Sequence, residues 1–168
     1  MNTSSARILI PPVIPPHPSS PYDNWLAAFP LRSFLELGAY DSAPASARGH
    51  ARNLLEEWQL GYLAEVVLLV LSELVTNSVI ATSEARWEAG LPPVRLWVLG
   101  GTPGVMLLVW DALAEDPRPR QADVWDESGR GLLIVRRYSA MWDSYPAPVP
   151  PGGKVTCALI DQPCPPDD

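Results

Sequence analysis

The feature that most constrains the fold is a largely apolar stretch at residues 63–82. Polar residues interrupt it along one side, at Ser72, Glu73, Thr76 and Asn77. Its length and its period near 3.6 residues predict one long helix with an apolar face for the core. No uninterrupted apolar run reaches the roughly 18–20 residues that cross a bilayer, so the pattern favours a globular domain over a membrane span.

The segments before this helix predict a strand and another helix. Residues 34–40 alternate apolar and polar side chains, as an edge strand does, and residues 45–58 carry apolar side chains at helical spacing. The four residues Asp41-Ser42-Ala43-Pro44 lie between them. They predict a helix start with a capping side chain and a proline in the first turn.

The second half of the chain predicts two strand pairs and a short helix. Apolar segments at residues 94–99 and 105–110 form a hairpin joined by the turn residues 100–104. A helix at residues 132–139 and strands at residues 140–145 and 154–160 complete the domain. The order strand-helix-helix-strand-strand-loop-helix-strand-strand predicts an α/β (α+β) fold, a two-layer sandwich of helices on one mixed, mainly antiparallel sheet.

The 168 residues fit a single domain, which we assign to residues 25–161. Residues 1–24 are rich in proline and lack periodicity, which predicts an extended or disordered arm. Residues 162–168 are expected to form a disordered tail.

The charge and the cysteines narrow the class of protein. A net charge of −7 argues against direct binding to nucleic acid, so any bound phosphate must be held by local donors. Cys157 and Cys164 imply no disulfide framework. Residues 1–10 lack the sustained apolar stretch of a signal peptide. We therefore expect a cytoplasmic protein that does not contact the membrane.

The polar side of the long helix carries the first candidate site. Glu73 and Asn77 stand four residues apart, which places their side chains on one face of the helix, one turn apart. A carboxylate and an amide oxygen stacked in this way hold Mg²⁺ or orient a hydroxyl nucleophile. The pair also fits the solvated face of an amphipathic helix, and taken by itself it favours that interpretation.

A carboxylate and a glycine-containing turn give two further candidates. Asp111 follows the apolar strand at residues 105–110, where it accepts a hydrogen bond from an amine such as that of adenine or simply caps a turn. Gly129-Arg130-Gly131 opens a helix, where backbone N–H groups and a guanidinium favour a phosphate. An ordinary tight turn explains this segment equally well. Gly153-Lys154-Val155 is not a P-loop, because it begins a strand and lacks the following Ser or Thr.

Taken together and in this order, these motifs resemble those of the gyrase, histidine-kinase and chaperone ATPase superfamily. The resemblance is closest to its small branch of anti-sigma-factor serine/threonine kinases. Residues 72–78 (SELVTNS) resemble the N box of that branch, Asp111 with Pro117 its first glycine box, and residues 127–135 (ESGRGLLIV) its second. Residues 152–156 (GGKVT) resemble its closing strands. The resemblance covers residues 29–161 and implies a Bergerat-type ATP-binding fold.

The resemblance also implies a role for each matching residue. Asn77 would coordinate the Mg²⁺ of bound ATP, and Glu73 would act as the catalytic general base that activates a serine hydroxyl or a water. Asp111 would accept a hydrogen bond from the adenine amine, with Thr156 close to the base. Residues 112–128 would form a mobile lid. The phosphates would be bound by Gly129, Arg130, Gly131 and Leu132.

Two functions follow from the resemblance. The first is a protein serine/threonine kinase that phosphorylates a small antagonist protein and sequesters a sigma factor or another transcription regulator. The alternative is a non-catalytic ATP-dependent switch, in which the lid decides whether a protein partner is held. Asp111 lacks the glycines that follow it in the fuller superfamily pattern, and residues 80–82 lack the basic residue and histidine frequent in the kinase branch. ATP binding is therefore better supported than phosphotransfer. A homodimer is common in this branch, but the periodicity of this chain gives it no separate support.

Overall fold

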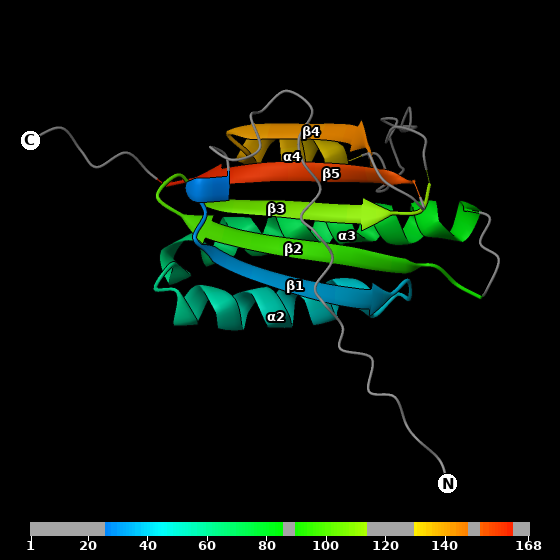
Figure 1. Ribbon diagram of the computed structural model, residues 1–168, viewed down its shortest axis with the longest axis horizontal. Helices are drawn as coiled ribbons and strands as arrows, with labels where there is room; N and C mark the ends of the chain where they lie inside the picture. The colour runs from blue at the N-terminus through cyan, green and yellow to red at the C-terminus, as the bar shows by residue number, and fades with distance from the viewer. Residues whose placement is uncertain (1–25, 86–89, 114–129, 148–151, 163–168) are drawn as a thin grey trace, which may run out of the picture.

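The computed structural model describes residues 26–85, 90–113, 130–147 and 152–162. The proposed arm, most of the proposed lid and residues 163–168 lie outside these ranges. In chain order (Figure 1) the elements are β1 (Leu31–Gly38), α2 (Ala43–Glu57), the 3-10 turn η1 (Gly61–Leu63), α3 (Ala64–Glu84), β2 (Pro93–Gly101), β3 (Gly104–Asp111), α4 (Gly131–Tyr138), β4 (Met141–Pro146) and β5 (Lys154–Asp161).

The five strands form one sheet in the order β1-β2-β3-β5-β4, and every neighbouring pair is antiparallel. The expected antiparallel character is confirmed, whereas the expected mixed character is not found among these strands. Two helices separate β1 from β2 along the chain, and β2 runs antiparallel to β1. β4 follows β3 through one helix and runs in the same direction, but β5 lies between them and no parallel neighbours result.

Helices α2, α3 and α4 lie on one face of the sheet, behind it in Figure 1, which confirms the two-layer α+β sandwich. The central helix is α3, which contacts α2, α4, β2, β3 and β5. Its apolar side is buried at Val67, Val70, Leu71, Leu74 and Val75. On α2 the predicted apolar face is also buried, at Ala47, Ala51 and Leu55.

Residues Gly61–Ser83 are long and apolar enough to span a membrane by length and composition. In the structure, the apolar side chains of this segment pack against the sheet and against α2. A helix that packs along one side against a sheet needs the same apolar composition. The predicted core helix is therefore confirmed.

The start of α2 differs from the prediction in one respect. Pro44 lies in the first turn as expected, but the N-cap residue Ser42 makes no side-chain capping hydrogen bond. Its backbone has helical torsion angles (φ −79°, ψ −12°). An N-cap side chain reaches the N–H groups of the first turn from extended backbone, so the predicted capping side chain is wrong.

The β2–β3 hairpin is tighter than the predicted turn at residues 100–104. The ladder continues to the pair Gly101 and Gly104, so that only Thr102 and Pro103 form the turn. Gly104 has a φ of +130°, and a β-carbon on it would collide with the carbonyl oxygen of Ile160. Glycine is required there because neither the torsion angle nor the space admits a side chain.

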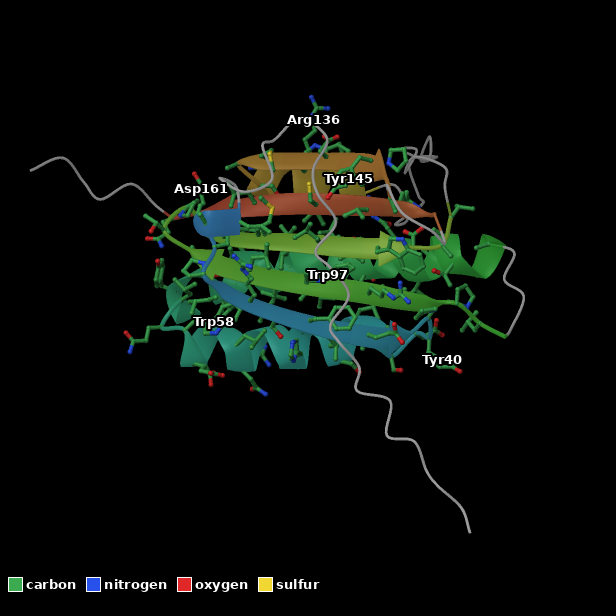
Figure 2. The ribbon with its side chains drawn as sticks, viewed as in Figure 1. Tyr40, Trp58, Trp97, Arg136, Tyr145 and Asp161 are labelled. Atoms are coloured by element: carbon green, nitrogen blue, oxygen red, sulfur yellow. The ribbon has the colours of Figure 1, made fainter. Side chains whose placement is uncertain are left out.

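The face of the sheet opposite the helices carries a second apolar cluster, which we call the outer-face cluster. Figure 2 labels two of its members, Trp97 and Tyr145, on the side of the sheet away from the helices. Its buried members are Phe29, Trp97, Leu99, Met106, Leu108, Trp110, Tyr145, Val155 and Cys157.

Candidate functional site

The first turn of α4 packs against the polar side of α3 and brings two of the predicted motifs together. A β-carbon on Gly131 would collide with Oε2 of Glu73 and would lie 3.7 Å from Nδ2 of Asn77. The Gly131 backbone therefore lies directly against both side chains. A residue with a side chain could be accommodated only if the Glu73 carboxylate moved.

The side-chain amide of Asn77 has an unsatisfied hydrogen-bonding group within the described part of the chain. Its Nδ2 is buried, and no described residue accepts a hydrogen bond from it. Such a group costs roughly 1–3 kcal/mol when it is left unpaired. The amide oxygen and nitrogen exchange places by a half-turn about χ2, so the unpaired end suits either a phosphate oxygen or a cation. Asn77 is thus available to a ligand.

Glu73 does not behave as a solvated surface carboxylate. It is half-buried, and burial raises the pKa of its carboxyl above the ordinary value. A carboxylate whose pKa moves towards neutrality is a better general base than one that titrates normally. The preceding residue is held in place, since Arg48 of α2 donates a hydrogen bond to Ser72 Oγ (3.1 Å), which donates to the Leu68 carbonyl (2.7 Å).

Asp111 comes to the same region from the sheet. It ends β3 with its side chain on the helix-facing side, where alternation also places the core residues Val105 and Leu107. A hydrogen bond from Ser78 of α3 favours its charged form. Because Ser78 directly follows Asn77, the second motif lies beside the first.

The strongest partner of Asp111 is Lys154, at the start of β5. Lys154 Nζ lies 2.7 Å from Asp111 Oδ1, and the two side chains are only 4% and 1% exposed. Nζ also donates to the Leu113 carbonyl (3.3 Å), and the Leu113 N–H donates to Asp111 Oδ1 (3.1 Å). Burial raises the pKa of Asp111, and the contacts with Lys154 and Ser78 oppose that shift without cancelling it. The carboxylate is thus held in place from three directions.

Lys154 was not predicted to belong to the site. The sequence places this lysine in the closing strands (residues 152–156) and excludes a P-loop because Lys154 begins a strand, as the structure confirms. One signal was present, since the only lysine of the chain stands at the head of a strand that is otherwise largely apolar. A buried charge needs a partner, and the carboxylate that ends the apolar strand β3 was the candidate.

Thr156 lies next to this ion pair on the helix-facing side of the sheet. It is two residues beyond Lys154 on β5 and is in register with Val109, two residues before Asp111. Its hydroxyl lies 3.4 Å from the Ser144 hydroxyl of β4. The pairing places Thr156 diagonally across from Asp111 on the same face of the sheet.

The predicted phosphate-binding turn is described only in part. Gly129 and residues 114–128 lie outside the described residues. Arg130 is exposed, and its carbonyl accepts the first hydrogen bond of α4, from the Ile134 N–H (3.0 Å). The N–H groups of Gly131 and Leu132 come before that bond and have no carbonyl within the helix to bond to, which is the position at which helix N–H groups can bind an anion.

Among the described residues, the histidine of α2 lies outside this site. His50 lies on α2 and forms a hydrogen bond with Ser33 of β1 (2.9 Å), and burial lowers the pKa of its imidazole. Within the described ranges, no group of three or more His, Cys, Asp or Glu side chains is arranged to hold a metal ion. A Mg²⁺ ion here would depend on Asn77 together with ligand phosphates and waters, which is how Mg²⁺ is commonly held at nucleotide sites.

No protein-family model matches this chain, and no curated protein matches it either. Function is therefore inferred from the residues that the fold brings together.

Proposed function

We propose that this chain binds ATP with Mg²⁺ and transfers phosphate to a serine of a protein partner, and that it thereby controls a transcription regulator in the cytoplasm. One observation carries the proposal. Along one side of α3, Glu73 and Asn77 lie against Gly131, and the next residue, Ser78, interacts with Asp111. The proposed phosphate site on α4, the cation ligand Asn77 and the acceptor Asp111 on β3 thus lie along one side of α3.

The phosphate end of the site fits a nucleotide. Because Gly131 has no side chain, α4 begins directly against Glu73, and the N–H groups of Gly131 and Leu132 and the Arg130 guanidinium are donors that would bind the phosphates. The unpaired amide of Asn77 is free to bind the cation. When bound, ATP with Mg²⁺ supplies a phosphoryl group whose charge is partly neutralised.

The base end of the site requires Asp111 to accept one more hydrogen bond. Asp111 already accepts hydrogen bonds from Lys154, Leu113 and Ser78, but a carboxylate has two oxygens and about four acceptor positions. The remaining position would receive the adenine amine. Lys154 favours the charged form of Asp111, which can only accept hydrogen bonds. Thr156 lies beside the pair and would contact the base.

Glu73 is the group that would perform the chemistry. Its carboxylate would take the proton of the attacking serine hydroxyl while the hydroxyl oxygen bonds to the γ-phosphorus, and the bond from that phosphorus to the bridging oxygen would break to release ADP. Phosphoryl transfer depends chiefly on position and charge, and a carboxylate fixed against Gly131 with a raised pKa fits this role.

Glu73→Gln should abolish catalysis without affecting nucleotide binding. A general base contributes about 100-fold or more to the rate, so slow release of labelled phosphate from γ-labelled ATP should fall by about that factor. ATP affinity should remain within a few-fold of wild type. Glu65→Gln, at an exposed position in the first turn of the same helix, should retain full activity.

The same assay separates the kinase from the non-catalytic switch. If the wild-type chain binds ATP but neither hydrolyses it nor labels a protein substrate, the switch is correct and the kinase assignment is wrong. If Glu73→Gln turns over as fast as wild type, Glu73 is not the base.

A further inference from the structure

The outer-face cluster is buried although the three helices lie on the other side of the sheet. Leu108 is 0% exposed, Met106 1% and Trp97 3%. Figure 2 shows Trp97 on the middle of this face. An antiparallel sheet with one face turned to water usually carries polar side chains there, but these strands present large apolar ones. The burial of these large apolar side chains indicates that another segment packs on this face.

Described residues that lie outside the strands pack against this face at its two ends, while Phe34 and Arg95 of the strands themselves contact the rings of Trp97 and Trp110. Leu26, Ala28 and Phe29 pack at the end where β2 finishes, since a β-carbon on Gly101 would collide with the Ala28 carbonyl oxygen. Ala112 and Ala147 join the cluster at the opposite end, beside the last residue of β3 and of β4. The centre, around Trp97 and Leu108, lies between these two groups.

We propose that residues 8–16 of the N-terminal arm (ILIPPVIPP) bind across the centre of this face. The arm joins the described chain at Leu26, which already lies against the end of the outer face. In an extended conformation, the 25 residues before Leu26 reach about 75 Å at roughly 3 Å per residue. Five strands are only about 20–25 Å wide. The arm is therefore long enough to cross the whole face.

The other segments outside the described ranges are less suited to this position. Residues 86–89 and 148–151 are short and are fixed at both ends. Residues 114–129 join the end of β3 to α4 on the helix side and are rich in charge. Residues 163–168 (PCPPDD) carry two carboxylates and lack the large aliphatic side chains of residues 8–16.

The chemistry of the arm matches the chemistry of the face. Residues 8–16 contain only Ile, Leu, Val and Pro. Proline-rich extended segments bind to surfaces lined by aromatic rings, because they are already ordered and lose little conformational entropy. Trp97 and Trp110 supply such rings on neighbouring strands. Covering them would also remove a large apolar patch from water.

The reactivity of the Cys157 thiol measures whether the outer face is covered. This thiol belongs to the outer-face cluster, is 2% exposed, and burial raises its pKa to about 12. A thiol in that state reacts slowly with an aromatic disulfide reagent. The measurement uses the full chain carrying Cys164→Ser, so that only Cys157 reacts. Adding Ile10→Asp, Val13→Asp and Ile14→Asp should raise the labelling rate at least tenfold.

A matched control carries the same charge in the same arm. Thr3→Asp, Ser4→Asp and Ser5→Asp lie outside residues 8–16 and should leave the labelling rate unchanged. An unchanged rate in the Ile10, Val13 and Ile14 variant would overturn the proposal. A cover formed by a second copy would also overturn it, and would appear as labelling that slows with protein concentration and a dimer mass by light scattering in both arm variants.

A second measurement does not depend on the stability of the variant. A photo-cross-linker at position 13 of the otherwise unchanged chain should attach to peptides from β2, β3 or β5. Cross-links to other peptides, or none within the chain, would contradict the assignment. This face is opposite the helix layer, so neither experiment depends on the proposed nucleotide site.

Discussion

Lys154→Met is expected to destabilise the fold by about 3–5 kcal/mol, because it leaves the Asp111 carboxylate buried without its counter-ion. The substitution keeps most of the side-chain volume, so the loss would come from the charge and not from a cavity. Urea unfolding at neutral pH, followed by circular dichroism, measures it.

The pH dependence of the stability of Lys154→Met shows whether the unpaired Asp111 charge causes the loss. Burial raises the pKa of Asp111 and contact with Lys154 lowers it, so removal of the lysine raises the folded-state pKa further above the unfolded value. The folded state of the variant then binds a proton more readily than the unfolded state, and its stability rises as the pH falls through the folded-state pKa. The deficit should therefore be largest at neutral pH and shrink in acid.

Two controls isolate the buried pair. Asp111→Asn combined with Lys154→Met leaves no buried charge and should lose less stability than Lys154→Met alone. Glu36→Gln breaks the exposed Arg95–Glu36 pair (2.9 Å) and should cost less than about 1 kcal/mol. A similarly small cost for Lys154→Met would show that the ion pair is not a main support of this end of the sheet.

Gly131→Ala is expected to weaken ATP binding at least tenfold while the fold remains intact. The new β-carbon would displace the Glu73 carboxylate and so disturb the region beside Asn77 where the phosphates are proposed to bind. The atom that must move is the end of the flexible Glu73 side chain, so the cost in stability should be small. Titration calorimetry gives the affinity, and thermal unfolding confirms that the variant is folded.

Gly49→Ala is the matched control for that substitution. Gly49 lies in the interior of α2, and a β-carbon on it would meet no atom within 4 Å. Alanine should stabilise this helix by about 0.5–1 kcal/mol and leave ATP affinity unchanged. Equal ATP affinity in Gly131→Ala and Gly49→Ala would remove Gly131 from the site.

The parts of the fold that were predicted from the sequence depend on local periodicity. The apolar spacing of α3 and the alternating or continuous apolar runs of the strands are set within each segment, and they led to the correct element order and layer architecture. The hairpin turn and the Ser42 cap were less well predicted, because they depend on backbone torsion angles that many sequences share.

The candidate site was only partly predictable for a related reason. Spacing alone placed Glu73 and Asn77 on one helix face, and a helix start pointed to Gly131. The ion pair between Asp111 and Lys154 depends on β3 and β5 being neighbours in a register that pairs these two residues. Sequence alternation shows which face a side chain occupies, but it does not show which strand lies beside it. The burial of the outer face has the same origin, since continuous apolar strands do not reveal what covers them.

If Asn77, Asp111 and the start of α4 bind one nucleotide, titration calorimetry with ATP should detect the binding. We expect saturable heat for the folded wild-type chain with Mg²⁺, and a large loss of affinity when the metal is chelated or when Asn77→Ala is introduced. A folded wild-type chain that gives no binding heat with millimolar ATP and Mg²⁺ would show that these residues do not form a nucleotide site.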